Sequence, residues 1–141
     1  MRVFYIFNIK NEFKYLYKET PSLLYGILKQ IYCLEKEDIL YGKNIYNQIV
    51  ERVEKEEIDK YLFIRLHQDM PYSKRGDVHY MNNLYKDEVS RLIAKNTYIK
   101  IETESSFSSF FNYLGDFNSD FFACDFERLD FFWLDSIKTL V

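Results

Sequence analysis

The residue types that most often carry catalysis are sparse in this chain. It has two histidines, His67 and His79, and two cysteines, Cys33 and Cys124. A hydrolase needs a nucleophile, a base and an orienting group within reach of one another. The sequence has neither a Gly-x-Ser-x-Gly elbow nor a His-Glu-x-x-His helix. A cysteine–histidine pair that meets only in the fold stays open, but the motifs favour a protein that is not an enzyme.

The carboxylates offer one metal-like pattern. The stretch Asp116–Asp120, with Glu127 at its twelfth position, has the spacing of oxygen ligands in a calcium loop. Its sixth position is Phe121, where the sharp turn of such a loop needs glycine. We therefore interpret the stretch as a helix exit, a polar turn and a buried strand, and expect neither a metal nor a cofactor.

Composition and charge limit the remaining classes. The chain has 141 residues, 48% of them hydrophobic, which fits one folded domain. A net charge of −3 disfavours direct binding to nucleic acid or to an acidic membrane. No apolar run reaches membrane-span length, no signal peptide is evident, and two lone thiols fit a reducing compartment, so we expect a cytoplasmic protein. The 13 Tyr and 13 Phe favour a protein-binding surface.

The first half of the chain is mostly helical in pattern. An aromatic and β-branched run predicts a strand over Arg2–Asn8. Capping residues and apolar residues at three- and four-residue spacing predict the helices that follow. They are Glu12–Lys18 with Asn11 as N-cap, a helix starting at Thr20-Pro21, Asp38–Val53 and Glu56–His67.

The second half reads mainly as strands. We expect a loop over Pro71–Gly76, with the Arg75-Gly76-Asp77 tripeptide as a turn, and leave Tyr80–Glu88 open between a helix and an irregular connection. The other expected elements are a hairpin of Arg91–Lys95 and Tyr98–Glu104, a helix Phe107–Tyr113 closed by Gly115, and strands Phe121–Phe126 and Phe131–Leu134. This order predicts an α+β (α/β) fold: a single layer of about five mostly antiparallel strands with helices packed on it.

The first short helix carries an apolar stripe of Phe13, Leu16 and Tyr17 at i, i+3 and i+4. On a generic helix such a stripe faces the core. The opposite face would then carry Lys14, Tyr15 and Lys18. An exposed Phe–Tyr pair on so short a helix would instead be an anchor for a partner protein. The spacing alone leaves both interpretations open.

Several segments in order resemble the SirA family. They are Ile9–Phe13 with Tyr17 one turn later, Leu62–His67, the hairpin end Tyr98–Ile101, Phe121–Phe126 and Phe132–Asp135. The resemblance implies one SirA-like domain over residues 1–141. It also implies a sporulation-linked protein that inhibits replication initiation by binding the N-terminal domain of the initiator DnaA. The family's partner-contacting positions match Phe13 and Tyr17, and Leu16 would lie at the edge of that interface.

The chain departs from the family pattern near its end. Asp135-Ser136 follows Trp133-Leu134 where the family has proline, so the resemblance assigns no role to this turn. We expect a monomer when free. Two alternatives remain: a protein-binding module with a different intracellular target, or a small metal- or phosphate-dependent enzyme or sensor. The latter would need His67, His79, Asp116, Asp120 and Glu127 to converge on one cleft.

Overall fold

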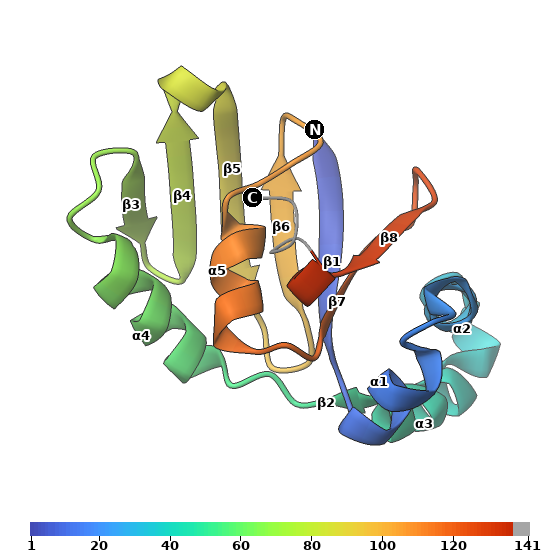
Figure 1. The fold of residues 1–141 in the computed structure, drawn as a ribbon. Helices are drawn as coiled ribbons and strands as arrows, with labels where there is room; N and C mark the ends of the chain where they lie inside the picture. The colour runs from blue at the N-terminus through green and yellow to red at the C-terminus, as the bar shows by residue number, and fades with distance from the viewer. Residues whose placement is uncertain (137–141) are drawn as a thin grey trace.

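The computed structural model describes residues 1–136, which contain eight strands and five α-helices (Figure 1). None of the helices in this range is long and apolar enough to cross a membrane. The elements are β1 (Arg2–Ile9), α1 (Asn11–Tyr17), α2 (Pro21–Tyr32), α3 (Ile39–Ile49), β2 (Val50–Glu51), α4 (Lys55–Leu66), β3 (Tyr72–Arg75), β4 (Val78–Asn83), β5 (Glu88–Ala94), β6 (Ile99–Thr103), α5 (Phe110–Phe117), β7 (Phe121–Asp125) and β8 (Asp130–Trp133), with short 3-10 turns at Lys36–Asp38 and Leu84–Lys86.

All the strands belong to one sheet in the order β3-β4-β5-β6-β1-β7-β8, and β2 pairs with the end of β1. Every pair is antiparallel. The first strand of the chain therefore lies inside the sheet, with Ile6 opposite Ile99 on one side and Ala123 on the other. Such a position explains why β1 reads as a continuous apolar run.

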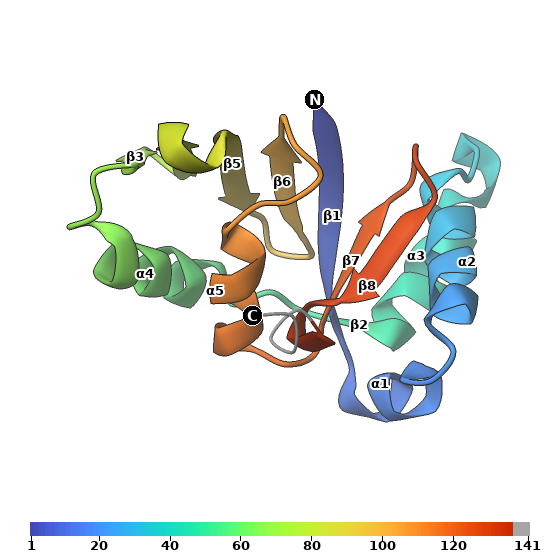
Figure 2. The same cartoon turned by 45° about the horizontal axis from the view of Figure 1, so that its top comes forward.

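The two faces of the sheet carry separate hydrophobic cores. Because side chains alternate along a strand, Phe4 and Ile6 enter one core while Phe7 and Ile9 enter the other. Helices α4 and α5 cover the first core, and α2 with the end of α3 covers the second, beside β1, β7 and β8 (Figure 2). Helices thus cover opposite faces at the two ends of the sheet.

The expected layer of about five strands was wrong, because the sheet formed by the described residues 1–136 has eight. The missed strands are β2, β3 and β4. Only Tyr72 is buried in the edge strand β3, whose other residues are polar and exposed, so it reads as a loop. The segment left open as helix or connection is instead the end of β4, a 3-10 turn and the start of β5.

Most helices lie close to their expected ranges, with three differences in how they begin or end. Helix α1 has Lys10 at its N-cap instead of Asn11 and no side-chain cap, and α3 ends at Ile49 because β2 follows. Helix α5 begins at Phe110 and runs past Gly115. Its start is fixed by the buried carboxylate of Glu88, which accepts hydrogen bonds from the Ser109 backbone N–H and hydroxyl at 3.1 and 3.0 Å.

Candidate partner-binding surface

Helix α1 continues directly from the central strand β1. The backbone N–H of Lys10 donates to the Ile49 carbonyl at 2.9 Å, and the Lys10 carbonyl accepts from the N–H groups of Phe13 and Lys14. Glu12 in the first turn suits the positive end of the helix dipole. A helix of seven residues is not stable by itself in water, so tertiary contacts must hold it in place.

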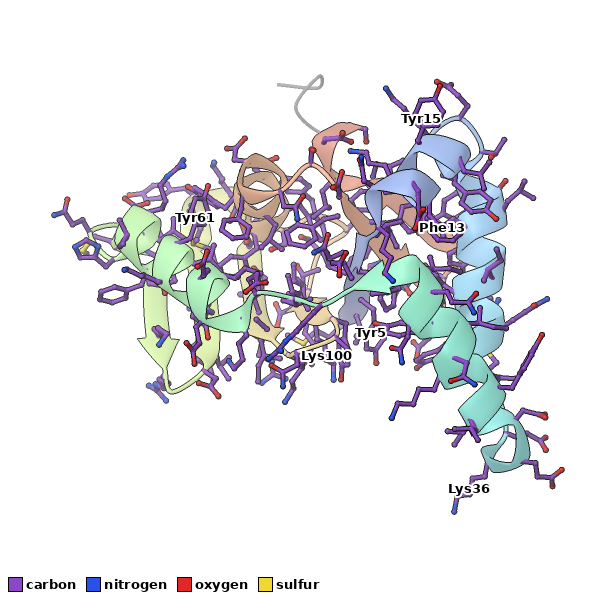
Figure 3. The ribbon with its side chains drawn as sticks, turned by 90° about the horizontal axis from the view of Figure 1, so that it is seen from below. Tyr5, Phe13, Tyr15, Lys36, Tyr61 and Lys100 are labelled. Carbon is purple, nitrogen blue, oxygen red and sulfur yellow. The ribbon has the colours of Figure 1, made fainter. Side chains whose placement is uncertain are left out.

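Two aromatic rings of α1, those of Phe13 and Tyr17, are neither fully buried nor fully exposed. Phe13 and Tyr17 are half-buried and pack against the core formed with α2, β7 and β8. Figure 3 shows Phe13 on the side of α1 turned toward the rest of the domain, while Tyr15 points away from it. The assignment of Phe13 and Tyr17 as partner contacts therefore stays a prediction, with part of each ring accessible.

The outer side of α1 carries two large exposed apolar side chains beside the exposed Glu12 and Lys18. Leu16 is 61% exposed and Tyr15 is 88% exposed, although large hydrophobic side chains usually avoid water. Together with the accessible parts of Phe13 and Tyr17 they form what we call the α1 patch. The predicted stripe is thus divided, since Leu16 faces solvent while the two rings lie at the border between solvent and core.

Lys14 does not lie on a solvated face as expected. Its side chain is only 13% exposed, with Nζ 2.9 Å from Asp135 Oδ2 and 3.5 Å from Asp120 Oδ1. The ammonium also donates to the Ser119 carbonyl and lies 5.5 Å from the centre of the Trp133 ring. Lys14 therefore clamps α1 to the segments on either side of the β7–β8 hairpin. Asp135, in the turn to which the family resemblance assigned no role, is one of its partners.

His67 and His79 lie in different surroundings. His67 is exposed at the end of α4, where its ring stacks on Phe63 and Nδ1 is 2.9 Å from the Phe63 carbonyl. His79 is fully buried in β4. No arrangement that joins them in one cleft is present in residues 1–136, where no group of three or more His, Cys, Asp or Glu side chains could hold a metal ion.

A buried polar chain connects His79 to α4, and sequence reasoning missed it. His79 Nε2 lies 2.7 Å from Asp59 Oδ1, and Nδ1 lies 2.7 Å from the Tyr72 hydroxyl. Because an ionised carboxylate only accepts, His79 donates from Nε2–H and Tyr72 donates to Nδ1. Burial lowers the pKa of His79 and raises the pKa of Tyr72 to about 12, so both are neutral near pH 7. Lys55 completes the chain at 2.9 Å from Asp59 Oδ2.

The calcium-like carboxylates are also dispersed. Asp120 binds Lys14, Asp116 belongs to the last turn of α5, and Glu127 is exposed in the turn after β7. The five residues of β7 that separate them are all buried in the sheet. Cys33 is exposed, whereas Cys124 is buried in β7 with the pKa of its thiol raised by burial.

We compared the sequence with protein-family models and with curated proteins. The family model described as sporulation inhibitor of replication protein SirA matches residues 2–138, nearly the whole chain. No curated protein matches the sequence.

Proposed function

This chain belongs to the SirA family of sporulation inhibitors of replication, and from that premise we propose that it binds the N-terminal domain of the initiator DnaA through the α1 patch. The family is one of regulatory inhibitors, which suggests a protein partner. The observation that carries the proposal is a pair of aromatic rings, Phe13 and Tyr17, left partly accessible on a helix that Lys14 holds in place. In this proposal the free protein is a cytoplasmic monomer and needs no cofactor.

The α1 patch has the composition of a binding hot spot. Aromatic residues dominate such sites because each contributes a large contact area with few rotatable bonds. Leu16 extends the apolar area at its edge, and Lys18 and Glu12 are exposed at the rim. Because tertiary contacts already order α1, binding costs less conformational entropy than it would for a free peptide.

Inhibition then follows from occlusion. Phe13 and Tyr17 fill an apolar groove on the DnaA domain, and the bound inhibitor blocks the contacts that this domain makes with itself or with the helicase-loading machinery. Each ring contributes about 2 kcal/mol if it is a hot spot, which corresponds to roughly 30-fold in affinity.

The test is titration of the full chain with the purified DnaA N-terminal domain. The double variant Phe13→Ala with Tyr17→Ala should weaken binding by a factor of about 1,000. Because both rings also pack on the core, circular dichroism and thermal unfolding must show that the variant is folded. Leu16→Glu, which changes only an exposed side chain, should weaken binding without affecting stability. Its matched control is Leu84→Glu, since Leu84 is 82% exposed on the turn between β4 and β5.

Two outcomes contradict the proposal. Wild-type affinity in both the folded double variant and Leu16→Glu would exclude the α1 patch as the contact surface. Loss of folding in the double variant, together with normal binding by Leu16→Glu, would show that the rings serve the core alone.

A further inference from the structure

Within residues 1–136, one face of strands β3–β6 carries no helix. Helices α4 and α5 pack on the other face, where Tyr72, Met81 and Leu92 enter the core. The strand register places a second set of side chains on the uncovered face, because Tyr80 pairs with Arg91, Arg91 with Glu102 and Ile93 with Lys100. Figure 2 shows α4 and α5 together on one side of these strands.

The uncovered face is more apolar than a solvated sheet face should be. An antiparallel sheet with one wet face normally alternates apolar residues inward and polar residues outward. Here Val78, Tyr80 and Ile93 point outward, are half-buried, and belong to neither hydrophobic core. Val89 continues the stripe and is 37% exposed. An apolar stripe on a wet face indicates a surface that another molecule covers.

Basic side chains surround this stripe. Arg91, Lys95 and Lys100 line a groove of about 340 Å³ together with Tyr80 and Tyr98, and Arg75 lines a neighbouring hollow. The carboxylate among them is Glu102, which lies 3.0 Å from Arg91 Nη2 and 4.0 Å from Lys100 Nζ. Among the residues that line these two hollows, four are cationic and Glu102 is the anion, so the lining is positive although the whole chain carries −3.

At one end the groove meets an aromatic cavity. This cavity of about 350 Å³ is lined mainly by aromatic side chains of β1, α2 and α3 and by Phe126, which follows β7, and it shares Tyr98 with the groove. Tyr5 is the cross-strand neighbour of Lys100. Figure 3 shows these two residues close together, on the side of the sheet toward which α3 extends. The cavity is large enough for one bulky apolar side chain, and burial raises the pKa of Tyr5 to about 12, so its hydroxyl stays neutral.

We propose that this open-face groove, with the aromatic cavity at its end, binds an acidic amphipathic segment of a protein partner. An aromatic or large aliphatic side chain of the segment enters the cavity, further apolar residues cover Val78 and Ile93, and its carboxylates meet Arg91, Lys95 and Lys100. A nucleic-acid strand fits less well, because its phosphate backbone would gain nothing from the apolar stripe of Val78 and Ile93. The groove is separate from the α1 patch and does not depend on the DnaA proposal.

The test is selection of a displayed random peptide library, about 16 residues long, on the full chain. We expect enrichment of peptides with a large apolar anchor flanked by Asp or Glu. In fluorescence anisotropy, Tyr80→Ser and Lys100→Glu should each weaken binding of the best peptide by about tenfold or more. The matched controls Tyr85→Ser and Lys60→Glu alter exposed residues outside the groove and should change it less than about twofold.

The Phe13→Ala, Tyr17→Ala double variant should bind the selected peptide like the wild type, which separates this inference from the α1 patch. The inference is overturned if no peptide is enriched, if enriched peptides lack an acidic bias, or if the two groove variants bind normally. A labelled oligothymidine that binds the wild type and loses affinity in the same two variants would assign the groove to nucleic acid instead.

Discussion

Replacing Lys14 by methionine should release helix α1 while leaving the rest of the fold intact. Methionine keeps the length and apolar stem of lysine but loses the ammonium that meets Asp135, Asp120 and the Ser119 carbonyl. Exposed ion pairs contribute about 0.2–1 kcal/mol, and hydrogen bonds to buried charged groups about 1.5–3 kcal/mol. The carboxylates of Asp120 and Asp135 are 28% and 35% exposed, so the clamp should contribute between these limits, at about 1–2 kcal/mol.

A loss of this interaction energy should affect the docking of α1 in particular, because α1 has no fully buried side chain that would hold it in place otherwise. A loss of 1–2 kcal/mol corresponds to a roughly 5- to 30-fold larger population of the undocked helix. Native-state amide hydrogen exchange can measure it at the N–H groups of residues 13 and 14, which donate to the Lys10 carbonyl. Amides of β1 supply the internal reference for global unfolding. Affinity for the DnaA domain should fall only in proportion to the fraction of molecules in which α1 becomes undocked.

Lys18→Met is the matched control, because Lys18 is exposed at the end of the same helix. Asp135→Asn should reproduce part of the effect, and combining it with Lys14→Met should be less than additive, since both changes remove one interaction. Wild-type exchange rates in Lys14→Met, or an equal effect of Lys18→Met, would refute the clamp.

Two further predictions concern stability, measured by urea unfolding. Gly26→Ala in α2 should raise the free energy of unfolding by about 0.5–1 kcal/mol, because a Cβ there meets nothing within 4 Å. Gly42→Ala in α3 should raise it by at least about 0.5 kcal/mol less, since its Cβ would approach Leu34 Cδ1 and force that side chain to rotate. Equal increases in the two variants would contradict this packing around Gly42. The free energy of unfolding should fall as pH drops below about 6.5, because His79 binds a proton in the unfolded chain at a pH where burial keeps it neutral in the folded protein. His79→Gln should flatten this pH dependence, and an unchanged slope would assign it to other groups.

The sequence predicted the elements whose pattern is set by burial. Strand β1 and helices α2 and α4 repeat apolar residues at the period of their structure, and each lies within a few residues of its expected range. Strand β3 was not predicted, because this edge strand buries only Tyr72 and its remaining residues have the polar pattern of a loop. The start of α5 failed because Glu88, which fixes it, lies 21 residues away along the chain. Contacts between distant segments leave no local periodicity to read.

The candidate site was predictable only in part. The spacing of Phe13, Leu16 and Tyr17 pointed to the helix that carries the proposed contact surface, and the family resemblance selected its rings. Neither source indicated that Lys14 points inward, because its partners Asp120 and Asp135 follow more than a hundred residues later. A lysine flanked by apolar residues on a short helix is a weak signal for such a clamp, since most exposed lysines have the same neighbours.

Half-burial of the two rings is compatible both with packing on the core and with the proposed contact to a partner. A ring packed on its own domain along one edge has already lost most of its rotamer freedom, so presenting its other edge to a partner costs little additional entropy. The clamp at Lys14 does the same for the backbone that carries Phe13 and Tyr17. Packing and binding should therefore be coupled in this helix, because any change that loosens α1 raises the entropic cost of recognition even when both rings are kept.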